Sequence, residues 1–153
     1  MIGREGPQLR GRVDRRDIER FAIASQDSSP IHRDESAAAA AGYEGLPSPP
    51  LLLSSILEWG AGPPIDELRA DGTGVGREGW LPLANLRLMG GGQDLVLHDP
   101  VLAGTEFIAT PALESIELKG ASGRELLFIV IVTEFRSTDG TPLVTCRETL
   151  IAR

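Results

Sequence analysis

The chain has one cysteine, two histidines and no long apolar run, and each of these features excludes some classes of protein or site. A single cysteine, Cys146, forms no disulfide within the chain, which fits a reducing compartment. It stands in an alternating apolar stretch and is predicted to lie in the core. The longest apolar run, LLFIVIV at 126–132, is too short to cross a bilayer as a helix, so we expect no membrane-spanning segment.

Positive charge is also scarce, because 15 Lys and Arg face 22 Asp and Glu and leave a net charge of −7. Nucleic acid is therefore not an expected partner, since phosphate binding needs a basic surface. An acidic protein can still hold an anionic ligand through a few basic side chains, for which Arg33, Lys119 and Arg124 are positionally plausible. The opening MIGREGPQLRGR has no apolar segment of the kind found in secretion signals, and we predict a cytoplasmic protein.

Familiar signatures of several enzyme classes are missing as well. The chain contains no GxSxG, CxxC, HExxH or GxxxxGK(S/T) motif. The glycine run GTGVG at 72–76 lacks the preceding strand that a dinucleotide-binding fingerprint requires. Two histidines supply too few ligands for a metal site, and His32 with Asp34 is weak evidence for one. We expect neither a metal nor another cofactor.

Two helices are predicted early in the chain. In VDRRDIERFAIA (13–24), Asp14 suits the N-cap, and apolar residues every three or four positions form one stripe. A second, Ala-rich helix is expected to follow the N-cap Asp34, to run through Ala41 and to end at Gly42.

A third helix is predicted in SPPLLLSSILEWG (48–60). Ser48 can cap it, Pro49 suits the first helical position, and Gly60 ends it. Its apolar residues cover most of the circumference, so we expect it to be buried nearly all round. The segment 60–80 that follows is rich in glycine and has only a brief helical hint at IDEL, which makes it a functional or mobile connection.

The second half of the chain reads as strands. The candidates are 83–89, 93–98, 105–118, 124–136 and 142–152, with a hairpin signal in STDGT at Asp139-Gly140. Pro111 indicates an edge strand or a bulge. Helices followed by consecutive strands predict one α+β domain over 1–153, with a long antiparallel sheet wrapped around the apolar helix. This is the hotdog arrangement.

The stretch SQDSSPIHRDE holds the strongest candidate for chemistry. Asp27 and His32 stand five positions apart, with Pro30 and two hydroxyl residues between them. Asp27 can simply satisfy backbone donors in a turn while His32 stays a loop residue. Alternatively, the stiffened loop holds the two titratable groups in a fixed relation, as an acid–base pair beside the start of the buried helix.

The longer stretch AIASQDSSPIHRDESAAAAAGYEG resembles the hydratase motif of the MaoC-like, (R)-specific enoyl-CoA hydratases. The core of that motif reads Asp-x-Asn-Pro-φ-His, where φ is apolar. Asp27, Pro30, Ile31 and His32 match at the correct spacing, and Ser29 replaces the Asn. GLPSPPLLL, LHDPVLAGTEFIAT and FRSTDGTPLVTCRETLIAR are similar to the subfamily named for the N-terminal half of MaoC-like, fatty-acid-synthase-like dehydratases. The resemblance runs from about residue 12 to the end.

The resemblance implies that Asp27 and His32 activate a water. One removes its proton and the other protonates Cα of an enoyl thioester, on CoA or on an acyl carrier, to give a (3R)-hydroxyacyl thioester. Ser29 would orient the water or the His32 loop. Pro50 occupies the position of a glycine whose N–H contacts the thioester carbonyl, and proline has no N–H, so the donor is expected from Leu51 or elsewhere.

Two other functions stay open. The chain can be a non-catalytic or half-catalytic hotdog subunit that shapes the acyl pocket for a sister subunit, or a hotdog thioesterase that uses a carboxylate and water. In each case the resemblance and the uncovered sheet edge predict a dimer, with a second copy or with a sister hotdog subunit. The segment 60–80 is expected to cover the acyl pocket.

Overall fold

The computed structural model describes residues 1–56, 59, 62, 64–68, 79–83, 86–120 and 125–153. Short helices occupy the first half of the chain and long strands the second. In chain order the elements are β1 (Leu9–Arg12), α1 (Arg15–Ala24), the 3-10 turn η1 (Pro30–His32), α2 (Glu35–Ala40), α3 (Leu52–Ser55), the 3-10 turn η2 (Ile65–Glu67), β2 (Leu88–Leu97), β3 (Glu106–Lys119), β4 (Leu126–Ser137) and β5 (Pro142–Ala152). Among the helices described here, none has the length and apolar character needed to cross a bilayer.

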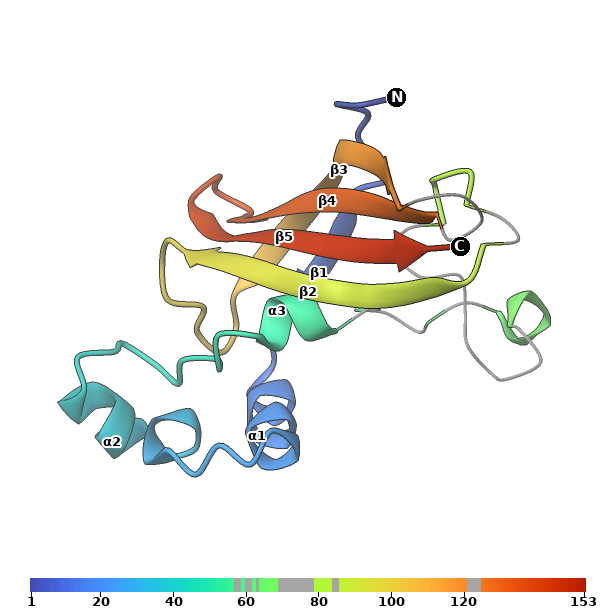
Figure 1. Cartoon of the computed structure of the whole chain (residues 1–153). Coiled ribbons are helices and arrows are strands. Elements are labelled where there is room, and N and C mark those ends of the chain that lie inside the picture. The colour runs from blue at the N-terminus through green and yellow to red at the C-terminus, as the bar shows by residue number, and fades with distance from the viewer. Residues whose placement is uncertain (57–58, 60–61, 63, 69–78, 84–85, 121–124) are drawn as a thin grey trace.

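The described strands form one antiparallel sheet in the order β1-β3-β4-β5-β2. Figure 1 shows α1 and α2 together at one end of this sheet, with α3 lying between α1 and the strands. The predicted α+β architecture is confirmed. One edge strand, β1, has 4 residues, whereas the other, β2, has 10.

The three long strands form where the alternation of apolar residues predicts them. The range 142–152 is identical to β5, and the ranges 105–118 and 124–136 correspond to β3 and β4 with shifts of one or two residues. The predicted hairpin joins β4 to β5, and Gly140 has the positive φ, 94°, that the turn requires. The Asp139 carboxylate holds the turn by accepting hydrogen bonds from the Ser137 hydroxyl and the Thr141 N–H.

The prediction of separate strands at 83–89 and 93–98 is wrong. Residues 88–97 form the single strand β2, because the glycines at 90–92 make a bulge within the strand and not a turn between two. The short edge strand β1 was not predicted, since four residues are too few to display an alternation.

Pro111 lies inside β3, which has a neighbour on each side, so its strand is not an edge. Its carbonyl accepts a hydrogen bond from Gly6, beyond the end of the pairing with β1. The missing N–H therefore faces a break in that pairing. A bulge follows between Leu113 and Ser115, in agreement with the alternative reading of the proline as a bulge signal.

Both early helices form as expected. The backbone N–H of Asp14 donates to the Asp17 carboxylate at the start of α1, and the apolar stripe of this helix is buried at Ile18 and Ala22. The Asp34 carboxylate accepts hydrogen bonds from two backbone N–H groups at the start of α2. Gly42 follows that helix with a φ of 90°, as a helix-ending glycine does.

The third helix is much shorter than predicted, since α3 comprises only Leu52–Ser55 and Ile56 is already extended. Ser48 does not cap it and Pro49 is not its first residue. The late start has a local reason, because a residue before proline is driven out of the helical region, and Pro49 precedes Pro50. The predicted end at Gly60 lies outside the described residues.

As predicted, most of the circumference of α3 is buried. Leu52, Leu53 and Ser54 are buried, but Leu51 at its N-cap is 48% exposed. The buried leucines pack into a core with Phe107 and Phe135, whose ring centroids lie 5.9 Å apart. Cys146, predicted to be a core residue, lies in the same cluster.

Candidate functional site

The loop after α1 turns back on itself at Asp27. The Asp27 N–H donates to the Ala22 carbonyl at 2.8 Å, and Gln26 before it adopts a φ of 58°, which reverses the chain. The Ser29 N–H then donates to Asp27 Oδ1 at 2.9 Å. Pro30 opens η1 next, and this single turn carries His32 back toward the aspartate.

Asp27 and His32 are in contact. His32 Nε2 lies 3.2 Å from Asp27 Oδ2, while Oδ1 of the same carboxylate is held by the loop backbone. The His32 side chain is 6% exposed and the Asp27 side chain 34%. The pair is therefore shielded on its imidazole side and accessible on its carboxylate side, which suits a group that must receive a small molecule.

A backbone carbonyl sets the proton position on His32. Its Nδ1 lies 2.8 Å from the Pro47 carbonyl oxygen, in a buried contact. A carbonyl only accepts, so Nδ1 carries the hydrogen and donates. Nε2 is then the nitrogen that exchanges protons, and it faces the Asp27 carboxylate. The two atoms are close enough to pass a proton between them when one of the two groups carries it.

Arg15 ties the loop to the helices on either side. From α1 its guanidinium binds Glu19 at 2.7 Å, Glu35 of α2 at 2.9 Å and the Arg33 carbonyl at 3.0 Å. Hydrogen bonding to Glu19 is the main cause that raises the pKa of Arg15 above its ordinary value. These contacts hold the end of the loop that follows His32 against the first turns of α1.

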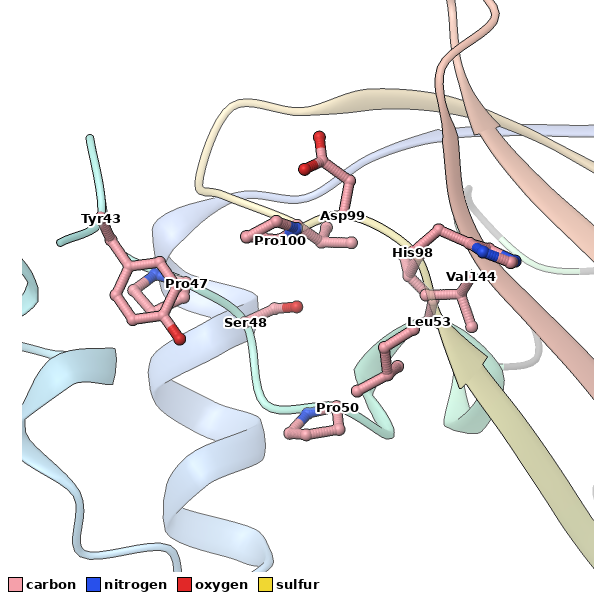
Figure 2. Close-up of a pocket in the computed structure, with 11 residues that line it drawn as sticks. Tyr43, Pro47, Ser48, Pro50, Leu53, His98, Asp99, Pro100 and Val144 are labelled. Atoms are coloured by element: carbon pink, nitrogen blue, oxygen red, sulfur yellow. The ribbon is translucent and has the colours of Figure 1, made fainter. Parts of the chain in front are cut away.

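Pro47, the acceptor for His32 Nδ1, also lines a pocket. This pocket has a volume of about 230 Å³ and lies between the 47–53 segment and the end of β2, where Leu97 is followed by His98. Asp27 and His32 do not line it, and Pro47 is the residue that links the pair to it. Figure 2 shows the Ser48 hydroxyl directed into the space between Leu53 and the loop after β2.

A family model described as "FAS1-like, dehydratase domain region" matches residues 1–146. The chain belongs to this family. A UPF0336 protein of Saccharopolyspora erythraea is 33% identical over 153 residues, which cover 99% of this chain and 88% of the relative.

Solved structures agree on the fold of this FAS1-like dehydratase-region protein. A chain of the HadBC (3R-hydroxyacyl-ACP dehydratase) complex from Mycobacterium tuberculosis superposes with a TM-score of 0.74 at 20% identity, covering 98% of this chain and 96% of that one. A MaoC-like dehydratase from Rhodospirillum rubrum gives 0.70 at 20% identity, covering 99% and 91%. The predicted hotdog fold and the predicted relation to the MaoC-like proteins are both confirmed.

The remaining predicted site residues of this dehydratase-region protein, Ser29, Pro50 and Leu51, have different surroundings. Ser29 contacts Asp27 through its backbone N–H, and its hydroxyl makes no hydrogen bond within the described residues. Pro50 lines the pocket, whereas Leu51 does not. The Leu51 carbonyl accepts hydrogen bonds from Ser54 and Ser55, and its N–H has no acceptor in the described part of the chain.

Several residues around the pocket were not predicted as site residues. Pro47 acts through its carbonyl, for which no side-chain signal exists in the sequence. Tyr43 and Ser48 line the pocket from the connection between α2 and α3, and His98 lines it from the loop after β2. His98 Nε2 lies 2.9 Å from the Thr145 hydroxyl. Of these, only His98 carried a sequence signal, as the second histidine of the chain.

The basic residues considered for an anionic ligand are partly occupied. Arg33 donates to the Asp27 carbonyl at 3.3 Å, and Lys119 pairs with Glu117 at 2.9 Å. Arg124 lies outside the described residues. Within the described ranges no group of three or more His, Cys, Asp or Glu side chains is placed to hold a metal ion.

Proposed function

We propose that this protein adds water to an α,β-unsaturated acyl thioester, or removes it in reverse, and interconverts enoyl-CoA and (3R)-hydroxyacyl-CoA. The observation that carries the proposal is the Asp27–His32 contact, in which a shielded imidazole is anchored on Nδ1 and presents Nε2 to a carboxylate at 3.2 Å. Membership in a dehydratase-region family supports the same reaction class.

The chemistry needs one proton on the pair at the start. A water beside the pair gives a proton to whichever group is the base, and its oxygen bonds to Cβ. The electrons of the carbon–carbon double bond move toward the thioester carbonyl as an enolate. The group that holds the proton then delivers it to Cα, and the carbonyl reforms. One water has been added across the double bond, and the pair again holds one proton.

The enolate oxygen needs hydrogen-bond donors. Pro49 and Pro50 have no N–H, and the Leu52 N–H already donates to the Pro49 carbonyl at 3.0 Å. We assign one donor to the Leu51 N–H. A crystal of the protein with a bound thioester should have the carbonyl oxygen about 3 Å from that nitrogen. A carbonyl with no donor nearby would favour an accessory role instead.

The protein is expected to work as a dimer, with itself or with a sister hotdog subunit. The outer side of β2 has no partner strand within the described residues, and Met89, Val96 and Leu97 on this strand are half exposed. A long edge with exposed apolar side chains favours pairing with another strand. The other edge, β1, is short and carries Arg10 and Arg12, which discourages pairing.

A second candidate is the accessory subunit that shapes the acyl pocket of a catalytic partner. The observation that favours it is the proline pair at 49–50, which removes backbone donors where hydratases present an N–H. The similar HadBC structure is described as a complex. A purified protein that is inactive alone, but restores activity when a sister hotdog subunit is added, would support this role.

One assay separates the functions. The full-length protein is incubated with crotonyl-CoA and with longer enoyl-CoA thioesters, while the enoyl absorbance and the free thiol are both followed. Loss of enoyl absorbance without thiol release is the expected result. Thiol release with the absorbance retained would indicate a thioesterase. If neither the enoyl absorbance nor the free thiol changes, in the homomeric protein and after a sister subunit is added, the proposed hydratase is overturned. The cytoplasmic location stays a prediction.

A further inference from the structure

The pocket beside the pair is apolar except for a few groups, and only some of these face its interior. Figure 2 shows the Ser48 hydroxyl pointing into the pocket, between Pro100 on one side and Leu53 on the other. In the same view the Asp99 carboxylate points away from this space, and the His98 ring turns outward, toward its Thr145 partner. Ser48 therefore presents a hydroxyl to a largely apolar space, which Tyr43 also lines.

The backbone around Ser48 is held firmly. The Ser48 N–H donates to the Val101 carbonyl at 2.7 Å, and Pro47 forms a bridge with Leu102. Prolines precede and follow Ser48, and each restricts the backbone. A hydroxyl on such a segment keeps its position when a ligand arrives, which is the preorganisation that charge stabilisation requires.

The Ser48 hydroxyl makes no hydrogen bond to any residue that the structure describes. Each of its neighbours in the chain contributes a different part of the site. Pro47 supplies the carbonyl that anchors His32, and the two prolines after Ser48 supply no N–H. Ser48 directly follows Pro47, and adjacent Cα atoms are about 3.8 Å apart, so Ser48 is next to the residue whose carbonyl binds His32.

From this juxtaposition we infer that the Ser48 hydroxyl donates a hydrogen bond to the thioester carbonyl oxygen and stabilises the enolate. The inference rests on the proposed function and identifies one of its catalytic residues. A hydroxyl can replace a backbone N–H at this position because both are single donors of similar reach. The prolines that remove the backbone donor are thereby compatible with catalysis by this chain itself.

The kinetic test uses the full-length protein with crotonyl-CoA. Ser48→Ala is expected to lower kcat by about 10²–10³, the loss typical of one oxyanion donor, with little change in KM. Ser48→Thr keeps the hydroxyl and should retain most of the activity. Ser55→Ala, on the exposed end of α3, is the matched control and should behave as wild type. Equal melting temperatures for all variants show that the losses do not come from unfolding.

A spectroscopic measurement tests the contact without turnover. The ligand is butanoyl-CoA labelled with ¹³C at the carbonyl, which has no double bond to hydrate. It is bound to three proteins: Asp27→Asn, Asp27→Asn with Ser48→Ala, and Asp27→Asn with Ser55→Ala. A hydrogen bond lowers the carbonyl stretching frequency, so adding Ser48→Ala should raise it and adding Ser55→Ala should not.

The outcomes separate the inference from the function on which it rests. If the wild type is active and Asp27→Asn is not, but Ser48→Ala leaves both kcat and the carbonyl band unchanged, the inference is overturned and the hydratase stands. If the wild type and Asp27→Asn are equally inactive and the band is also insensitive to Ser48→Ala, both are overturned.

Discussion

His32 Nδ1 lies 2.8 Å from the carbonyl oxygen of Pro47, a residue 15 positions further along the chain. This buried hydrogen bond sets which imidazole nitrogen faces Asp27. It also joins the acid–base loop to the segment that forms the pocket wall. The loop proposed to be catalytic and the neighbouring pocket are thus joined through one backbone carbonyl.

Removing either member of the pair should abolish most of the turnover. Asp27→Asn and His32→Ala are each expected to lower kcat by about 10²–10⁴, because general acid–base catalysis contributes that much. The melting temperature should change little for Asp27→Asn, whose side chain is partly exposed. Steady-state hydration of enoyl-CoA and thermal unfolding are the measurements, with Glu117→Gln at the far end of β3 as a matched carboxylate-to-amide control.

The double variant of Asp27 and His32 should be little worse than the worse single variant. Both groups are proposed to act on the same water, and residues that act as a unit have non-additive effects. Additive losses would mean that the two side chains serve separate steps. Near-wild-type turnover in either single variant would remove the pair from the mechanism.

The backbone N–H of Ser29 is expected to affect kcat, whereas its side chain is not expected to affect it. Its N–H binds Asp27 Oδ1 at 2.9 Å, so Ser29→Ala should keep kcat close to wild type. Ser29→Pro removes the N–H, while the native φ of −57° lies within the range of proline. Hydrogen bonds to charged groups are worth about 1.5–3 kcal/mol, so Ser29→Pro should lower kcat about tenfold or more. Equal kcat values for the two variants would show that this contact does not position the carboxylate.

A charge on the β2 edge should split the dimer. Val96 is 52% exposed on this strand, and Val96→Arg is expected to convert a dimer into a monomer and to remove activity with it. Leu118→Arg makes the same change at an exposed apolar position of β3, away from the predicted interface, and should leave the dimer intact. Sedimentation velocity at micromolar concentration measures both. A stable and active wild-type monomer would contradict the predicted assembly.

The β4–β5 turn should contribute acid sensitivity to folding. Hydrogen bonds from the Ser137 hydroxyl, and then from Thr141, lower the pKa of Asp139 to about 2 in the folded protein. An unfolded aspartate titrates near 3.9, so this stabilisation is complete above about pH 4 and is lost as the pH falls toward 2. In Asp139→Asn the free energy of unfolding should change less with pH across that window. Urea unfolding at several pH values tests this. If the free energy of unfolding has the same pH dependence in both proteins, Asp139 is not a source of the acid sensitivity.

Much of the architecture could be predicted from the sequence because the relevant forces are local. The apolar stripe of α1, the N-cap at Asp34 and the alternation in the three long strands depend on neighbours a few positions away. The Asp27–His32 spacing with Pro30 between them belongs to the same class, since one short turn brings the two side chains together. Their 3.2 Å contact is a local consequence of that loop.

Only the tertiary structure decided the rest. The apolar pattern predicts a helix that continues past Ser55, but in the folded chain Ile56 is extended and α3 ends there. The glycines at 90–92 became a bulge because β5 offers a continuous partner on one side of them. The contact of His32 with Pro47 and the direction of the Ser48 hydroxyl depend on segments that meet only after folding. A backbone carbonyl carries no residue-specific signal, so its role in a site becomes visible only when the chain is folded.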